Sequence, residues 1–334
     1  MKLVIQIPCL DEEVTLPATL RDLPHVLNGL DAVEIVVIDD GSKDRTSEVA
    51  GKAGAHVVRI PGTRGLAHAF MVGIDTCLAR GADIIVNTDG DNQYVGEDVA
   101  ALVAPILSGD ADVVIGARPI TTIASFSTSK KVLQHLGSWA VRRLSGTTVA
   151  DATSGFRAFS REAALRLNVF SRYTYTLETI VQAGQRGLRI ASVPVRVNSV
   201  SRQSRLVRNS FDYILRTGGA LLRMSVVYRP FRFFMIPSLL MFAAASAIGL
   251  RFLWYFVASE GAVSGHVQSL ILAGILFATS AALFVVALLG DLLAINRKLL
   301  EELQLDARRR GLASGACARE GSTRAEASVV HRCS

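Results

Sequence analysis

Asp89 and Asp91 form the strongest chemical signal in the sequence. They are separated only by Gly90 and follow an apolar run at 84–87. Two carboxylates at this spacing can share one hard divalent cation, because Mg²⁺ and Mn²⁺ prefer oxygen ligands and leave room for substrate phosphates. Gly90 lets the backbone approach a ligand closely. The pair therefore predicts a site for Mg²⁺ or Mn²⁺ with Asp89 and Asp91 as protein ligands.

A second acidic pair, Asp39 and Asp40, follows another apolar run at 34–38 and precedes Gly41 and Ser42. Carboxylates at the end of a strand can accept hydrogen bonds from ribose hydroxyls or from a base N–H. Ser42 is also a good residue for capping the start of a helix, so a capped turn is the alternative interpretation. The two interpretations are compatible with each other.

The elements that must position these carboxylates alternate along the first part of the chain. Short apolar runs rich in β-forming residues are separated by stretches of helical periodicity. This alternation favours an α/β fold with a mostly parallel, doubly wound sheet. Ligands bind beyond the carboxyl ends of the strands in such sheets, so the acidic groups at 11, 39–40 and 89–91 should meet at one rim. The predicted strands are 3–7, 34–38, 56–60, 84–87, 112–115 and 189–195, and the predicted helices include 66–80 and 99–107.

Two long apolar segments, 233–258 and 267–295, stand near the C-terminal end of the sequence. Each is long enough to cross a hydrocarbon core of roughly 30 Å. Basic residues flank the outer ends, with Arg229 and Arg232 before the first segment and Arg297 after the second. By the positive-inside rule, the segments form a transmembrane hairpin with both outer ends in the cytoplasm. The alternative is a pair of buried core helices.

The chain carries a formal charge of +7, from 36 Lys and Arg residues against 29 Asp and Glu residues. This excess favours an acidic partner such as nucleic acid, anionic lipid or a phosphorylated substrate. Arginines gather at 205–232, beside the apolar segments, which favours lipid over nucleic acid. A solvated helix face is the alternative for this basic amphipathic stretch. The N-terminal apolar run is too short for a secretory signal, so we expect the first domain to stay in the cytoplasm.

Taken together, these residues resemble the family 2 glycosyltransferases, which have the GT-A nucleotide-diphospho-sugar transferase fold. The stretch 39–46 is similar to that family's Asp-Asp-Gly-Ser-x-Asp-x-Thr element, and 8–13 is similar to its Pro-x-x-Asn-Glu-Glu opening. Asp89 and Asp91 match its metal-binding Asp-x-Asp, although Tyr94 stands where the family usually has His. The resemblance implies a nucleotide-sugar site formed by Pro8, Asp11, Glu12, Asp39, Asp40, Gly65, Asp89 and Gln93.

A narrower resemblance covers the stretch 151–157, which looks like the Asp-x-x-Ser-Gly-Phe-Arg element of polyprenyl-phosphate sugar synthases. This group includes dolichol-phosphate-mannose synthase, and its bacterial undecaprenyl-phosphate members carry two C-terminal transmembrane helices. The resemblance implies transfer of a sugar from a UDP- or GDP-sugar to a polyprenyl phosphate. It also implies that the acceptor phosphate is bound by Arg157, Arg202, Ser204 and Arg205.

The expected reaction is a displacement at the anomeric carbon that inverts its configuration. Asp91, assisted by Asp89, would hold the metal that neutralises charge on the leaving nucleoside diphosphate. Arg157 is the third expected catalytic residue, with a structural ion pair to Asp151 as the alternative. Glu178, the fourth, would contact the sugar or orient the acceptor, with a helix-surface glutamate as the alternative. Arg118 is expected to fix the rim.

We therefore predict a cytoplasmic catalytic domain at 1–204 and a basic juxtamembrane segment at 205–232. A transmembrane hairpin follows at 233–296, and a basic, disordered cytoplasmic tail at 297–334. The expected location is the inner membrane, with the catalytic domain on its cytoplasmic face. A homo-oligomer is a further expectation, and nucleic acid is not an expected partner.

Other functions fit the sequence less well. A glycosyltransferase acting on a glycolipid or glycan hydroxyl is the first alternative, and a non-catalytic membrane-tethered scaffold is the second. A dinucleotide-dependent oxidoreductase would need Gly-x-Gly-x-x-Gly after the first strand, where this chain has Asp11, Glu12 and Glu13. Those carboxylates would repel a pyrophosphate.

Overall fold

The computed structural model describes most of the chain, which falls into two compact units. The first unit joins Met1–Leu215 to Leu303–Ser334, and the second is Arg216–Glu302. The statements below concern the described residues, which are 1–119, 142, 146–147, 149–169, 175–198, 218–219, 222–258 and 267–330, with side chains to Ser314.

The first unit is built on one seven-stranded mixed sheet in the order β3-β2-β1-β4-β6-β5-β7. Neighbouring strands are parallel except at β6, which runs antiparallel between β4 and β5. The α/β prediction is confirmed, and the antiparallel strand is an addition to it. The strands are β1 Lys2–Cys9, β2 Ala32–Asp39, β3 His56–Arg59, β4 Ile84–Asn87, β5 Val113–Ala117, β6 Arg157–Ser160 and β7 Ile190–Pro194.

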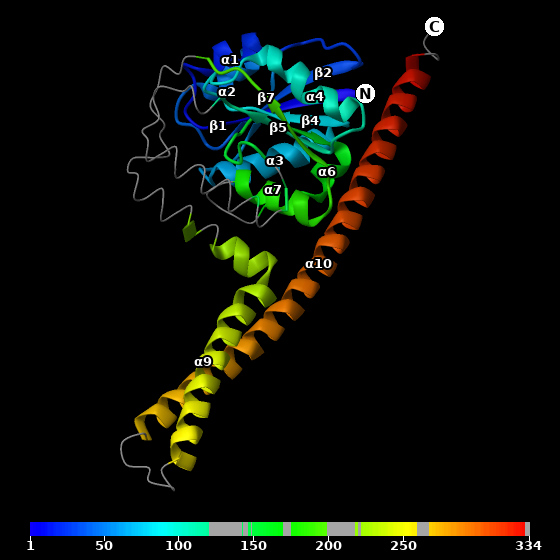
Figure 1. Ribbon diagram of the computed structural model, residues 1–334. Helices are drawn as coiled ribbons and strands as arrows, with labels where there is room; N and C mark the ends of the chain where they lie inside the picture. Colours follow the sequence, from blue (N-terminus) through cyan, green and yellow to red (C-terminus); the bar gives the residue numbers. More distant parts are fainter. Residues whose placement is uncertain are drawn as a thin grey trace. The chain divides into compact units, whose positions relative to one another are not determined.

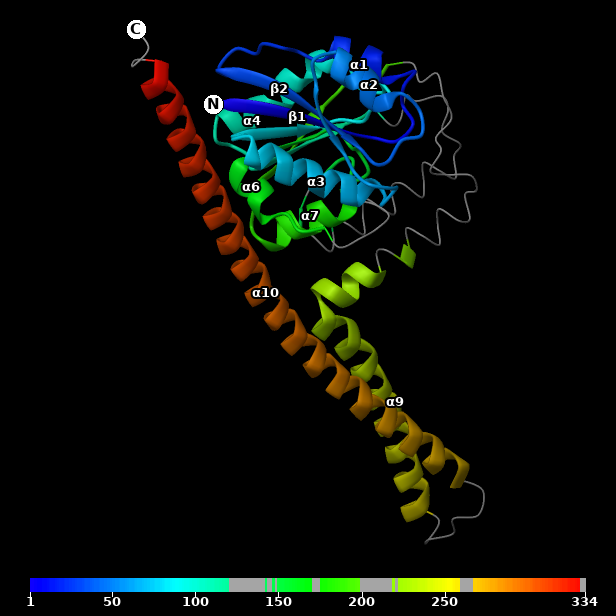
Figure 2. The same ribbon diagram turned by 180° about the vertical axis from the view of Figure 1, so that it is seen from behind.

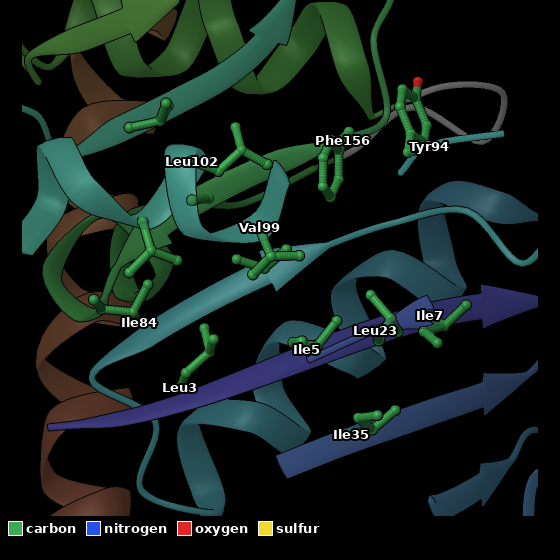
Figure 3. Packing of buried hydrophobic residues seen from close by; sticks show 14 of the residues in the cluster. Leu3, Ile5, Ile7, Leu23, Ile35, Ile84, Tyr94, Val99, Leu102 and Phe156 are labelled. Carbon is green, nitrogen blue, oxygen red and sulfur yellow. The ribbon is translucent and has the colours of Figure 1, made fainter. Parts of the chain in front are cut away.

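Helices cover both faces of this sheet, which explains why the central strands are apolar on both sides (Figures 1 and 2). Side chains alternate along a strand, so Leu3, Ile5 and Ile7 of β1 all face one layer. There they join the core cluster with Val99 and Leu102 of α4 (Figure 3). The helices are α1 Leu16–Asp22, α2 Thr46–Lys52, α3 Leu66–Ala79, α4 Val99–Leu107, α6 Arg161–Arg166 and α7 Thr176–Gln185.

The other face of the sheet carries a polar network inside its core. Gln6 of β1 donates to the Asn87 side chain of β4 at 2.9 Å. Asn87 donates in turn to the Tyr175 hydroxyl at 2.8 Å, and the Tyr175 ring stacks on Phe70 of α3 at 4.0 Å between centroids. Gln6, Asn87, Phe70 and Tyr175 are almost completely buried. Because the buried side-chain amides of Gln6 and Asn87 both have partners, the network fixes α3 and α7 against the sheet.

The second unit contains α9 (Pro230–Ala258) and most of α10 (Val267–Val330). Both helices are long and apolar enough to span a membrane: an 18-residue stretch of each has a mean hydropathy of 2.0 in α9 and 2.5 in α10, and most of each stretch is exposed. Ser238 and Ser280 join the helices through reciprocal bonds from each hydroxyl to the other carbonyl, at 2.9 and 2.8 Å. Exposed apolar surface of this kind suits lipid better than it suits a buried helix pair.

The tail from residue 297 was expected to be disordered, and the structure differs from this expectation. The structure continues α10 from Val267 through Val330. Part of this range is rich in helix formers, and Arg297 and Glu301 pair at 3.4 Å across one turn. Of the predicted juxtamembrane segment, 222–228 is helical. The boundary predicted at 204 lies outside the described residues and stays a prediction.

The last described part of α10 belongs to the first unit. There Arg308 donates to the carbonyls of Leu165 and Leu167, at 3.2 and 2.7 Å, and lies 3.3 Å from Asp75. Arg309 bonds both carboxylate oxygens of Glu162, at 2.7 and 2.9 Å. The carbonyls at the C-terminal end of α6 are thereby given a positive partner, which also complements the helix dipole.

Candidate active site

The acidic segments meet at one edge of the sheet, as the sequence predicts. Parallel pairing sets Cys9 beside Asp39 and Gln6 beside Asn87, so the carboxyl ends of β1, β2 and β4 lie at the same edge of the sheet. Hydrogen bonds then join the loops that follow. The Asp11 amide donates to the Ser42 hydroxyl at 3.0 Å, and the Thr19 hydroxyl donates to the Gly90 carbonyl at 3.2 Å. The result is a continuous rim of carboxylates.

Asp89 and Asp91 stand at this rim with electrostatics that suit a cation. Burial, followed by repulsion from Asp91, raises the pKa of Asp89 to about 7, although Arg118 and Arg157 oppose the shift. Burial also raises the pKa of Asp91. Among the described residues, none donates a hydrogen bond to the Asp89 carboxylate, whereas Asp91 accepts the Gln93 amide at 3.1 Å. Carboxylates held in this way gain from a bound divalent cation.

The donor set fits Mg²⁺ or Mn²⁺ only in part. No group of three or more His, Cys, Asp or Glu side chains that could hold a metal occurs within the described ranges. Asp89 and Asp91 would thus supply two carboxylates, and water or substrate phosphates would have to complete the coordination. This is the usual arrangement for magnesium at phosphate-transfer sites.

Asp39 and Asp40 are buried, and both accept hydrogen bonds from the protein itself. Asp39 accepts the Ser42 amide at 2.7 Å and the Ser47 hydroxyl, and these bonds hold its pKa below the ordinary value against the opposing effect of burial. Asp40 accepts the amides of Arg64 and Gly65, at 2.9 and 2.7 Å. These bonds hold the turn after β2 and the start of α3, but Ser42 does not cap α2, which begins at Thr46 after Arg45 without a side-chain cap. A direct nucleotide contact of Asp39 or Asp40 stays a prediction.

Arg118 has the rim-fixing contacts expected of it. Its guanidinium donates to Asp151 at 2.7 and 3.2 Å and to the Thr153 hydroxyl at 2.8 Å. The pair is largely buried, and Arg118 holds the pKa of Asp151 below its ordinary value although burial opposes this. The structural ion pair that was the alternative for Arg157 thus belongs to Arg118, and that alternative is wrong.

Arg157 is 0% exposed, and its donors go to the protein itself. It donates to the carbonyls of Ser154, Ala152 and Thr176 at 2.7, 2.9 and 2.6 Å, and to the Thr179 hydroxyl at 2.6 Å. Burial lowers the pKa of Arg157 to about 10. Because β6 carries this side chain into the interior, direct binding of an acceptor phosphate by Arg157 does not fit the geometry and is corrected here.

The remaining predicted residues have varied positions. Glu178 is 5% exposed and accepts the Gln182 amide at 3.5 Å, so the helix-surface alternative is wrong. Pro8 lies inside β1, and Glu12 accepts the Thr15 hydroxyl at 2.7 Å. Arg202, Ser204 and Arg205 lie outside the described residues, and their role stays a prediction.

Comparison with known proteins decides the family. Residues 4–167 match the model for glycosyl transferase family 2. An uncharacterized glycosyltransferase of Mycobacterium bovis is 32% identical over 216 residues, which are 63% of this chain and 94% of that protein. The chain belongs to glycosyl transferase family 2. An undecaprenyl-phosphate mannosyltransferase of Micrococcus luteus is 29% identical over 206 residues, covering 58% of this chain and 83% of that protein.

A solved structure supports the fold of this family 2 glycosyltransferase. Glucosyl-3-phosphoglycerate synthase from Mycobacterium tuberculosis, crystallised with Mn²⁺, UDP-glucose and phosphoglyceric acid, superposes with a TM-score of 0.53. The match is 22% identical and covers 67% of this chain and 78% of that one. This likeness confirms the GT-A fold, while the family match and the relatives confirm the enzyme class and the resemblance drawn from the motifs.

Sequence reasoning missed how Tyr94 is used by this glycosyltransferase. The Tyr94 hydroxyl accepts the Gly155 amide at 3.2 Å, and its ring stacks on Phe156 at 4.9 Å (Figure 3). The Gln93 carbonyl, in the same loop as Tyr94, accepts the Asn198 backbone amide at 2.9 Å. The available signal was the large aromatic residue three positions after Asp91, which indicates packing but not its partner.

Proposed function

We propose that this glycosyltransferase moves a sugar from a nucleotide-diphosphate donor, a UDP- or GDP-sugar, to a polyprenyl phosphate such as undecaprenyl phosphate. The observation that carries the proposal is the pair Asp89 and Asp91, which stands at the carboxyl ends of the central strands with both pKa values raised by burial. The two apolar helices support a lipid acceptor. The relative from Micrococcus luteus, named for an undecaprenyl-phosphate acceptor, supports the same choice.

The donor would lie along the rim. Asp89 and Asp91 would hold Mg²⁺ or Mn²⁺, which when bound supplies positive charge for the leaving diphosphate. Asp40 holds the Arg64 and Gly65 amides, and this fixes the start of α3 beside the donor. The predicted nucleotide-sugar contacts remain Pro8, Asp11, Glu12, Asp39, Asp40, Gly65, Asp89 and Gln93.

The acceptor phosphate is already anionic at neutral pH, so a strong general base is not required. Arg202, Ser204 and Arg205 would bind it through charge-assisted hydrogen bonds. Attack from the face opposite the leaving group inverts the anomeric carbon. Glu178, buried in α7, would contact the sugar or orient the acceptor. Arg157 serves here as a positioning residue. The catalytic unit would face the cytoplasm from the inner membrane.

The deciding experiment uses the full chain in detergent with undecaprenyl phosphate and a panel of UDP- and GDP-sugars. Products are followed by mass spectrometry with Mg²⁺, with Mn²⁺ and with EDTA. We expect one donor to give a lipid-phosphate sugar that disappears with EDTA and in Asp91→Asn. The matched control is Asp110→Asn, which changes an exposed carboxylate beyond the end of α4 and should keep full activity.

Two other results would count against the proposal. Metal-dependent binding of a nucleotide sugar without any lipid product would point to a hydroxyl acceptor on a glycolipid or glycan. Loss of both binding and turnover with every donor would leave the scaffold interpretation.

A further inference from the structure

The backbone of Gly155 forms a wall against the Asp89 carboxylate. A Cβ added at Gly155 would lie 2.7 Å from Asp89 Oδ2, 2.9 Å from Oδ1 and 3.1 Å from Cγ. Gly155 does not have a positive φ, so its backbone conformation is open to any residue. What requires glycine at this position is therefore the space taken by the Asp89 carboxylate.

Both peptide groups of Gly155 are held by buried side chains. Its amide donates to the Tyr94 hydroxyl at 3.2 Å, and its carbonyl accepts the Asn87 side-chain amide at 2.8 Å. Asn87 is 0% exposed and is itself fixed by Gln6 at 2.9 Å. The wall is thus tied to β4, which ends two residues before Asp89, and to the loop that carries Asp91.

Arg157 holds the residues on the N-terminal side of Gly155. Its guanidinium bonds the carbonyls of Ala152 and Ser154 and, through the Thr176 carbonyl, the first turn of α7. A segment bonded at so many buried points resists displacement. When crowded, the Asp89 carboxylate, at the free end of a short side chain, gives way before the wall does.

We propose that the segment 152–157 is a positioning element for the cation-binding carboxylate. Gly155 sets the place of Asp89, Asn87 and Tyr94 hold Gly155, and Arg157 fixes the segment from behind. The inference rests on the proposed cation site at Asp89 and Asp91. It gives this stretch a task at the donor side of the site, where its resemblance to known synthases implied contact with the acceptor phosphate.

The most direct test adds one methyl group at the wall. Mn²⁺ binding to the full chain in detergent is measured by electron paramagnetic resonance, without substrates, in the wild type and in Gly155→Ala. We expect the Kd for Mn²⁺ to rise about 10- to 100-fold, the range for disturbing the supports of metal ligands. The matched control is Gly51→Ala in α2, where an added Cβ meets nothing within 4 Å and Kd should stay unchanged.

A second variant guards against misfolding of the first. Tyr94→Phe keeps the ring on Phe156 and removes only the hydroxyl that accepts the Gly155 amide. Its Kd should rise several-fold, less than in Gly155→Ala. In turnover, both variants should show a higher KM for Mn²⁺, with kcat largely restored at saturating metal. A purely structural role would lower the melting temperature and leave KM for the metal unchanged.

The Asp91→Asn variant distinguishes failure of the positioning role from failure of the proposed cation site. If Asp91→Asn loses Mn²⁺ binding while Gly155→Ala and Tyr94→Phe bind Mn²⁺ like the wild type, the positioning role is overturned and the cation site stands. If Asp91→Asn also binds Mn²⁺ like the wild type, the proposed site itself is overturned. Weakened binding in all three variants, with Gly51→Ala unchanged, supports both.

Discussion

The carboxylates in this enzyme differ in their hydrogen-bond partners. This difference separates the carboxylates that support the fold from those that can take part in the reaction. Asp39 and Asp40 accept backbone amides and hold the turn before α2 and the start of α3. Asp89 accepts no hydrogen bond from the described residues, and burial raises its pKa to about 7. The sequence predicted the acidic rim from residue types, but it could not tell which carboxylates were already occupied, since that depends on backbone amides from distant loops.

The raised pKa of Asp89 predicts a pH-dependent stability of the metal-free enzyme. The folded chain binds this proton more tightly than the unfolded chain, whose aspartate pKa is about 3.9. The contribution of Asp89 to the free energy of unfolding is therefore intact below about pH 4, falls as pH rises to about 7, and stays low above it. Asp89→Asn should stabilise the protein above pH 7 by on the order of 2 kcal/mol.

Thermal melts in EDTA measure this effect. Asp89→Asn should melt roughly 5 °C above the wild type at pH 7.5 and at the same temperature at pH 4. Asp110→Asn, which alters an exposed carboxylate, serves as the control and should follow the wild type at both values. A constant difference between Asp89→Asn and wild type at all pH values would contradict the prediction.

Arg157 and the pair Arg202 and Arg205 should respond differently to substitution. Arg157→Met leaves three backbone carbonyls without their donor, and this should cost about 3–5 kcal/mol of stability. A large fall in the melting temperature of Arg157→Met would measure this loss of stability.

Arg202→Ala with Arg205→Ala should leave the melting temperature near that of the wild type. If these arginines bind the acceptor, the KM for polyprenyl phosphate should rise about tenfold or more. A double variant with unchanged KM would remove these two residues from the acceptor site.

Among the elements, the apolar strands were predictable from the sequence, and the antiparallel strand β6 was not. The six predicted strands correspond to β1 to β5 and to β7. β6 is only four residues long and begins with Arg157, so its pattern reads as polar although the side chain is buried. Its antiparallel place between β4 and β5 follows from pairing at a distance, which local periodicity does not encode. The helical continuation of α10 was missed because its composition resembles that of a soluble tail.

Packing between α3 and the sheet predicts the effect of one more glycine substitution. A Cβ at Gly73 would lie 2.3 Å from Gln6 Oε1 and 3.1 Å from Ile38 Cγ1. Gly73→Ala should therefore force α3 from the sheet or break the Gln6–Asn87 bond, at a cost of about 1–3 kcal/mol. Gly51→Ala, in open surroundings, should change little. Denaturant unfolding followed by tryptophan fluorescence or circular dichroism would measure both.

At the scale of the whole molecule, the chain returns to its first unit after the apolar helices. In this last part of α10, Arg308 and Arg309 bond to α6 and to the residue that follows it. Replacing both by Ala should lower the melting temperature of the first unit by the equivalent of about 1–2 kcal/mol, mainly through the carbonyls that Arg308 leaves unpaired. Arg310→Ala should have no such effect, because its described bond lies within its own helix. Equal melting temperatures of the double variant and Arg310→Ala would contradict the prediction.

The strand order also has a consequence for synthesis on the ribosome. β4 has neighbours in β1 and β6, but β6 emerges about seventy residues after β4 leaves the ribosome. Until then, β4 presents an open strand edge. β5 cannot yet join the sheet, because β6 is the strand that links it to β4. Open edges of this kind invite pairing with other nascent chains. Newly made chains should therefore be most dependent on chaperones between the emergence of β4 and that of β6, before either apolar helix has been translated.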